Sequence, residues 1–219
     1  VINLCGKELP LANNRELVWR VMQMNGSSSV MAYKVNRRDK AFRNRIRYHT
    51  TLDANATKRI VNRKVALRPP FNVNNRFFKS KSYVALSHEF AEFLHTSPYA
   101  IRVHQFFTRC QNPEEHFYAV MYMMPQVPGG YQEQLRDWYF HVENALWMFE
   151  EGAECGGQVV HDVCVVGLAD LERVLAGREG HLFHNKYFMS YDHTIMDCLE
   201  QRLVHRNRLE YRQECAPHV

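Results

Sequence analysis

Two adjacent glutamates near the middle of the chain are the residues best placed by type and spacing to do chemistry. They end the string Asn-Pro-Glu-Glu at positions 112–115, where asparagine can cap a helix, proline suits its first position and acids suit its first turn. Glu115 then has two interpretations. Its carboxylate can accept the backbone N–H of Asn112 within a helix cap, or it can take a proton from a substrate hydroxyl as a general base. On residue types alone, the cap is the simpler of the two.

Metal-binding and nucleotide-binding patterns are weak in this sequence. His88, Glu89 and Glu92 approach the zinc-peptidase pattern, but glutamate stands where its second histidine belongs. The sequence has neither a glycine-rich phosphate loop nor an Asp-x-Asp pair that would hold a metal-bound nucleotide diphosphate. We therefore expect no metal site. If the chain handles a nucleotide sugar, basic side chains must neutralise the diphosphate.

Basic residues concentrate between Lys34 and Lys64, where Asp39 and Asp53 are the only acids. This run is either a solvated surface or a positive wall for phosphate or an acidic sugar. Over the whole chain, Lys+Arg 28 against Asp+Glu 23 gives a net charge of +5. That excess is weaker than most nucleic-acid-binding proteins show. We expect no nucleic-acid partner.

Cysteines and glycosylation sequons indicate the compartment. Cys155 and Cys164 flank a glycine turn and a β-rich run and can close a short disulfide loop. Asn25 and Asn55 each begin an N-glycosylation sequon. Together these features favour a secretory-pathway lumen over the cytosol. The longest apolar run, residues 117–124, falls far short of the roughly 20 residues that a membrane-spanning helix needs.

Strands and helices are expected to alternate around these residues. A short buried strand is expected near residues 1–5, and further strands over 82–86 and 159–166. The expected helices cover residues 14–24, 87–94, 99–109, 112–123, 168–176 and 194–212, with part of 131–151 also helical. The basic segment has no clear period. The chain has no repeat or linker and is 46% hydrophobic, so we expect one compact α/β or mixed unit.

Strings along most of the chain resemble segments of one enzyme family, in the same order. They are Asn-Leu-Cys-Gly at 3–6, Tyr-Val-Ala-Leu-Ser at 83–87, Asn-Pro-Glu-Glu at 112–115, Pro-Gln-Val-Pro-Gly at 125–129, Cys-x8-Cys at 155–164 and Leu-Phe-His-Asn-Lys-Tyr at 182–187. The ordered set resembles the core-2/I-branching β-1,6-N-acetylglucosaminyltransferases, which form glycosyltransferase family 14.

The resemblance implies a type II Golgi membrane protein with a lumenal GT-A-like domain. Such a domain transfers N-acetylglucosamine from UDP-N-acetylglucosamine to an O-glycan or polylactosamine in β-1,6 linkage, with inversion and without a metal or other cofactor. Residues 1–219 would be the C-terminal portion of that single catalytic domain, an α/β fold with a mixed sheet flanked by helices. The N-terminal half and the transmembrane anchor, its only membrane contact, would lie upstream. The implied partners are a nucleotide-sugar donor and a glycan acceptor.

The resemblance also implies roles for single residues. Glu115 matches the catalytic base, and Lys186 matches a lysine that neutralises the departing diphosphate. Cys155 and Cys164 match a disulfide-bonded pair. The acceptor contacts that it implies are Arg45, Arg47 and Phe149.

Four positions depart from the family pattern, one of them mildly: Glu114 stands where the family has aspartate. His161 stands where the family has a diphosphate-binding arginine, and a neutral imidazole would hold phosphate less well. Phe149 replaces an aromatic residue with a phenol hydroxyl, and Lys81 replaces a small residue. Two alternatives to the branching activity stay open. One is another transfer within the family, of xylose or glucuronic acid. The other is a noncatalytic glycan-binding descendant, in which Lys81, His161 and Phe149 record the loss of donor chemistry.

Overall fold

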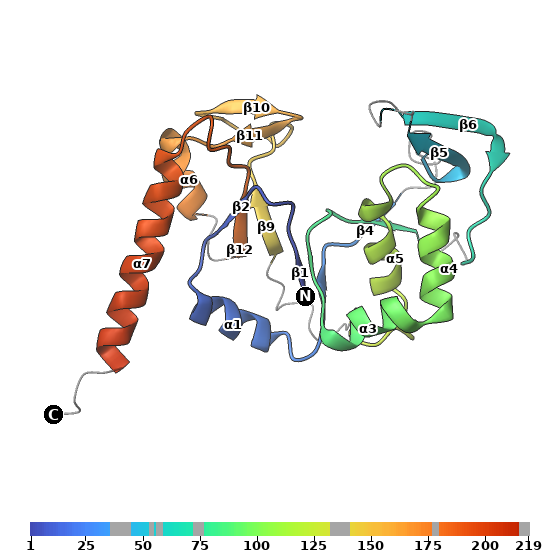
Figure 1. Ribbon diagram of the computed structural model, residues 1–219, viewed down its shortest axis with the longest axis horizontal. Helices are drawn as coiled ribbons and strands as arrows, with labels where there is room; N and C mark the ends of the chain where they lie inside the picture. Colours follow the sequence, from blue (N-terminus) through green and yellow to red (C-terminus); the bar gives the residue numbers. More distant parts are fainter. Residues whose placement is uncertain are drawn as a thin grey trace. The chain divides into compact units, whose positions relative to one another are not determined.

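The chain forms two compact units, each assembled from segments that are far apart in the sequence. The computed structural model describes residues 1–35, 45–52, 55, 59–71, 77–131, 141–176 and 180–214, whose helices and strands are drawn in Figure 1. Unit 1 comprises Val1–Asn3 and Gly26–Arg136, and unit 2 comprises Leu4–Asn25 and Asp137–Val219. That both belong to one catalytic domain stays a prediction.

Unit 1 combines small antiparallel sheets with short helices. Strand β8 is the centre of one sheet, with β1 and β3 at its edges. Elsewhere in the unit β4 pairs with β7 and β5 pairs with β6. The strands are β1 Ile2–Asn3, β3 Ser29–Val30, β4 Tyr33–Lys34, β5 Tyr48–Leu52, β6 Arg59–Ala66, β7 Phe78–Lys79 and β8 Val84–Ala85. The helices are α3 His88–Thr96, α4 Pro98–Phe107, the 3₁₀ turn η1 Pro113–Glu115 and α5 Phe117–Tyr122.

Aromatic rings build the core of unit 1. Phe71, Phe77, Phe106 and Phe107 are buried, and neighbouring ring centroids among them lie 5.1 to 6.0 Å apart. Such stacked, tilted and edge-on pairs contribute about 0.5–1.5 kcal/mol each beyond the area they bury. Helix α5 joins this core through five buried side chains: Phe117, Ala119, Val120, Met121 and Tyr122. The turn η1, which directly precedes α5, is therefore attached to a helix that is packed into the core.

Unit 2 is built around strand β12. This strand runs parallel to β9 and antiparallel to β2, while β10 and β11 form a separate hairpin. The strands are β2 Glu8–Pro10, β9 His141–Ala145, β10 Gln158–Val160, β11 Val163–Val165 and β12 His181–Asn185. The helices are α1 Asn14–Gln23, the 3₁₀ turn η3 Leu168–Asp170, α6 Leu171–Ala176 and α7 Thr194–Glu214.

The core of unit 2 joins its hairpin, sheet and helices. Its buried members are Leu11, Cys164, Val166, Val174, Tyr187, Ile195 and Leu199. His184 on β12 is also fully buried, and its ring meets that of Tyr187 edge-on at 5.7 Å. Desolvation of the cationic form lowers the pKa of His184 to about 3, and nearby His181 acts in the same direction. The imidazole is therefore a neutral core residue.

Several predicted elements are confirmed, with the physical reason visible in their caps. The Asn13 side chain accepts the Glu16 N–H, and the Glu16 carboxylate accepts the Asn13 N–H, which completes a capping box at the start of α1. Ser87 caps α3 by accepting the Phe90 N–H. The terminal helix also lies where the sequence predicts it.

Other predicted elements are wrong in type or extent. Within the segment 131–151, which was expected to be helical in part, residues 141–145 form strand β9 paired with β12, and residues 132–140 lie outside the described residues. Residues 158–165 form a hairpin where one strand was expected. The first strand covers only Ile2–Asn3 and is not buried. The basic segment, which has no readable period, contains β5 and part of β6.

Among the described residues, no helix is both long enough and apolar enough to cross a bilayer.

Candidate active site

Glu115 lies on a tight turn that is fixed at both ends. The turn η1 precedes α5, and Asn112 before it adopts a left-handed conformation with φ 54°. The predicted continuous helix is therefore interrupted, and Asn112 makes no side-chain bond to the helix backbone. The Ser80 N–H donates to the Glu115 carbonyl at 2.6 Å, and the Glu115 N–H donates to the Asn112 carbonyl at 3.2 Å. The backbone of Glu115 is thus held by Ser80, directly after β7, and by Asn112, directly before η1.

The Glu115 carboxylate is surrounded by donors from three parts of unit 1. Oε1 accepts a hydrogen bond from the side-chain Nδ2 of Asn112 at 3.1 Å, so the predicted bond to the Asn112 backbone is replaced by one to its side chain. Oε2 lies 3.2 Å from Lys79 Nζ and 3.6 Å from an Arg45 terminal nitrogen. Oε2 is shielded from solvent and makes an ion pair without a well-aligned hydrogen bond. It therefore retains capacity to accept a proton.

His116 supports the turn from the core side. Its ring is fully buried, stacks on Phe107 at 6.0 Å and meets Phe77 at 5.5 Å. Its Nδ1 lies 3.4 Å from the Phe78 carbonyl. Burial lowers the pKa of His116 to about 4, outweighing the opposite effects of the Phe78 carbonyl and Glu115. A neutral aromatic ring thus holds the position directly after the proposed base.

The structure brings one of the two predicted basic acceptor residues to Glu115. Arg45 makes the ion pair described above, whereas the Arg47 guanidinium lies over the ring of Tyr48 at 5.4 Å. Sequence reasoning did not single out Lys79 at all, although it did consider Lys81 nearby. Lys79 has no local signal for its role, because its contact with Glu115 depends on how β7 packs beside α5.

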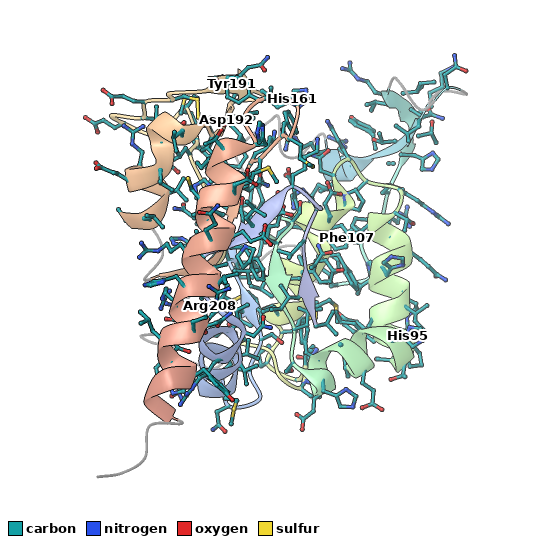
Figure 2. The ribbon with its side chains drawn as sticks, turned by 60° about the vertical axis from the view of Figure 1, so that its left-hand side comes forward. His95, Phe107, His161, Tyr191, Asp192 and Arg208 are labelled. Carbon is teal, nitrogen blue, oxygen red and sulfur yellow. A yellow bond between two sulfur atoms is a disulfide. The ribbon has the colours of Figure 1, made fainter. Side chains whose placement is uncertain are left out.

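The predicted donor-binding residues gather in unit 2, at the β10–β11 hairpin. Lys186 donates from Nζ to the Val160 carbonyl at 3.2 Å. His161, the residue after Val160, is exposed and adopts φ 52° in the hairpin turn. It is labelled in Figure 2. Lys186 therefore contacts the turn that carries His161.

Phe149 lies on a segment bonded to the same turn. The Met148 N–H donates to the Asp162 carbonyl at 2.8 Å. The Phe149 ring is 71% exposed and lies 5.1 Å from the ring of Trp147. An exposed aromatic ring of this kind offers an apolar platform to a sugar. Unit 2 thus holds Phe149, His161 and Lys186, and unit 1 holds Glu115 with Arg45.

One family model, described as Branch: Core-2/I-Branching enzyme, matches residues 1–175. The chain belongs to the core-2/I-branching enzyme family. The mouse (Mus musculus) "N-acetyllactosaminide beta-1,6-N-acetylglucosaminyl-transferase" is 29% identical over 212 residues, covering 94% of this chain and 50% of the relative. A Danio rerio relative, "Beta-1,3-galactosyl-O-glycosyl-glycoprotein beta-1,6-N-acetylglucosaminyltransferase 4", is 30% identical over 228 residues, covering 100% and 51%. The chain spans about half the length of these relatives, and the resemblance noted in its sequence is confirmed.

The disulfide that the family resemblance implies is present. Cys155 and Cys164 are bonded, with Cα atoms 5.6 Å apart, and the bond ties β11 to the segment before β10. These sulfurs and Asp170 form the one described group of potential metal ligands. Because the two sulfurs are bonded to each other, neither is a thiolate and the group is not a metal site.

The two predicted glycosylation sites lie at the surface. Asn25 is exposed, with φ 45°, in the turn after α1. Ser27, the hydroxyl residue of its sequon, is buried. Asn55 is exposed, and the rest of its sequon lies outside the described residues. Glycosylation of Asn25 and Asn55 stays a prediction.

Proposed function

We propose that this chain is the C-terminal portion of the catalytic domain of an inverting β-1,6-N-acetylglucosaminyltransferase. Its substrates would be UDP-N-acetylglucosamine and a hydroxyl group of an O-glycan or polylactosamine. The observation that carries the proposal is the Glu115 carboxylate, held on a rigid turn between Lys79 and Arg45. The relatives' names, which specify this transfer, support the choice of sugar and linkage.

Glu115 would act as the base. Its Oε2 takes the proton from the acceptor's C6 hydroxyl, whose oxygen attacks the anomeric carbon of the donor sugar. The bond from that carbon to UDP breaks as the new bond forms, and its electron pair leaves with UDP. A positioned base of this kind contributes about 10²–10⁴-fold to a rate. Lys79 and Arg45 are 43% and 35% exposed, so each can turn toward solvent as the hydroxyl approaches Oε2.

Lys186 and His161 would hold the donor diphosphate, in place of a metal. Lys186 now donates to the Val160 carbonyl, and it would exchange that neutral acceptor for a phosphate oxygen, which makes a stronger, charge-assisted bond. His161 can donate one N–H when neutral. This pair would compensate the charge that develops on UDP as the sugar departs.

Acceptor contacts would come from Arg45, Arg47 and Phe149, joined by Tyr33. Tyr33 faces Lys79 across the β4–β7 pair and is 54% exposed. Residues directly opposite in an antiparallel pair have side chains on the same face of the sheet. The Tyr33 ring therefore lies on the same side as the ammonium group that contacts Glu115, where an acceptor sugar can stack on it.

The remaining parts of the proposal concern fold type and location. We propose a GT-A-like domain in the Golgi lumen, attached to the membrane by an anchor upstream of this chain. The disulfide between Cys155 and Cys164 supports an oxidising lumen, because such bonds are rare in the cytosol.

A UDP-release assay on the complete lumenal protein tests the proposal. It would compare UDP-N-acetylglucosamine, UDP-xylose and UDP-glucuronic acid with O-glycan acceptors, in the presence of EDTA. We expect N-acetylglucosamine transfer, a kcat about 10²–10⁴-fold lower in Glu115→Gln, and little change in the control Glu114→Gln, whose side chain is exposed. Preference for another donor would replace the assigned sugar, and loss of turnover in EDTA would overturn the metal-free step.

A noncatalytic glycan-binding protein is the second candidate. One observation favours it: Lys79 and Arg45 both lie against Oε2 of Glu115, the buried atom that would take the proton. Saturable binding of an O-glycan by the wild type, without UDP release from any donor, would establish this alternative.

A further inference from the structure

Exposed basic residues collect on and beside the β5–β6 hairpin of unit 1. We call this set the hairpin cations; its members are Arg47, Arg63, Lys64, Arg68 and Arg109, all of them exposed. Within the described part of the chain, no carboxylate forms an ion pair with any of them. Like charges on and beside one hairpin repel one another, and this unfavourable free energy is reduced when an anion binds among them.

The base of the hairpin is fixed to the segment that leads into the Glu115 turn. The Thr50 N–H donates to the Arg109 carbonyl at 2.8 Å, and the Gln111 N–H donates to the Arg45 carbonyl at 3.0 Å. Gln111 directly precedes Asn112, where the turn begins. The hairpin cations are thus attached through backbone hydrogen bonds to the same frame that positions the proposed base.

An irregular register adds residues to the hairpin close to this frame. Tyr48 pairs with Ala66, but His49 pairs with Asn62, so residues 63–65 oppose a single step of β5. Extra residues in one strand bend it and redirect their side chains. Two of the three inserted residues are Arg63 and Lys64. A regular antiparallel ladder would have no inserted residues at this point, so the irregularity adds two cations to the hairpin.

We propose that the hairpin cations bind an anionic group carried by the acceptor glycan, either the carboxylate of an acidic sugar or a sulfate ester. This inference rests on the proposed transferase function and specifies its acceptor class. The anion would lie on a part of the glycan other than the hydroxyl that Glu115 activates. Arg45 is already paired with Glu115, whereas no described carboxylate pairs with the hairpin cations. The hairpin also exposes Leu52, Ile60 and Val61, so an anionic membrane is the competing partner.

Matched acceptors test the inference with the complete lumenal protein. The kcat/KM for a neutral O-glycan acceptor would be compared with that for the same acceptor bearing a sialic acid or a sulfate ester, at about 0.05 M and about 0.5 M salt. We expect a preference for the charged acceptors that weakens at high salt, because screening shortens the range of exposed charges. Comparing the sialylated and sulfated acceptors identifies which anion is recognised.

Three variants make the test specific. Arg63→Gln combined with Lys64→Gln should reduce the charged-to-neutral ratio of kcat/KM by about fivefold, the scale of two exposed ion pairs. Arg63→Lys keeps the charge and should keep most of the ratio. Arg208→Gln on α7, an exposed arginine of unit 2 labelled in Figure 2, should leave the ratio unchanged.

The outcomes separate this inference from the proposed function. If the wild type transfers no sugar to any acceptor, the proposed function fails and the inference fails with it. If transfer occurs but neutral and charged acceptors are used equally, the inference alone is overturned. It is also overturned if the double variant abolishes cosedimentation with vesicles of phosphatidylserine and phosphatidylcholine but leaves the acceptor ratio unchanged, because the hairpin then binds membrane.

Discussion

The Lys79 ammonium lies 3.2 Å from Oε2 of Glu115, the oxygen that also faces Arg45. The pairing holds the carboxylate in one orientation but also occupies the space that the acceptor hydroxyl would need if Glu115 is the proposed base. Acceptor binding and displacement of Lys79 are therefore expected to be coupled.

Replacing Lys79 should impair acceptor use without abolishing chemistry. Because the pair is partly exposed, Lys79→Met should lower kcat/KM for the acceptor by about three- to tenfold and the free energy of unfolding by at most about 1 kcal/mol. Lys79→Arg should restore most of the activity. Steady-state kinetics and urea unfolding measure both effects. A loss as large as that of Glu115→Gln would instead assign Lys79 a direct chemical role.

Lys186 is expected to act on the donor. Lys186→Ala should raise the KM for UDP-N-acetylglucosamine by about tenfold or more, since one charge-assisted hydrogen bond contributes about 1.5–3 kcal/mol. Arg173→Ala is the matched control, because Arg173 is an exposed cation of the same unit paired with Glu154. Unchanged donor kinetics in Lys186→Ala would remove this residue from the diphosphate site.

Tyr33 should contribute to acceptor binding through its ring. Tyr33→Ala is expected to raise the acceptor KM several-fold while donor KM stays constant, and Tyr33→Phe should behave like the wild type because stacking needs no hydroxyl. Initial rates at varied acceptor concentration provide the measurement. Equal effects of both variants would point to the hydroxyl rather than the ring.

The buried histidine beneath the turn predicts a loss of stability in acid. The pKa of His116 falls from its ordinary value of 6.5 to about 4 on folding, so between these values the unfolded state binds more protons. The contribution of His116 to the free energy of unfolding should therefore be fully present above about pH 6.5. It should decline toward pH 4, by up to about 3 kcal/mol.

Urea unfolding at several pH values measures this decline. His116→Phe should flatten the decline, because the phenylalanine side chain cannot bind a proton. The control His95→Gln, at an exposed position of α3, should retain the wild-type pH dependence. His184, whose pKa is also lowered, should account for part of the remaining slope. A His116→Phe profile identical to that of the wild type would contradict the assignment.

The disulfide should stabilise the part of unit 2 that carries His161. Replacing both Cys155 and Cys164 with serine is expected to cost about 2–4 kcal/mol in unfolding free energy and to weaken donor binding through the loosened hairpin. Cys110→Ser is the control for thiol removal at a residue outside the bond; its burial raises the pKa of the thiol to about 12. Equal stability of the wild type and the double variant would exclude a bracing role.

The sequence predicted those parts of the structure that depend on local signals. Asn13 and Ser87 were recognisable as caps because each bonds a backbone N–H three residues ahead. The disulfide was suggested by the spacing of Cys155 and Cys164 and implied by the family resemblance, whereas the role of Glu115 as a base stays a prediction. Lys79 and the β5–β6 hairpin were missed. The contact of Lys79 with Glu115 depends on packing between distant segments. The hairpin has no buried residue among its described side chains, so it lacks the alternation that marks a strand.

The order of the segments of the two units along the chain affects how the protein folds during its synthesis. Strand β2 is near the start of the chain, yet its hydrogen-bonded partner β12 is near the end, and all of Gly26–Arg136 lies between them in sequence and belongs to the other unit. During translation, β2 therefore remains without its hydrogen-bonded partner until all of the intervening residues and β12 have been synthesised. A premature stop anywhere before β12 would leave that early segment permanently unpaired and a target for quality control.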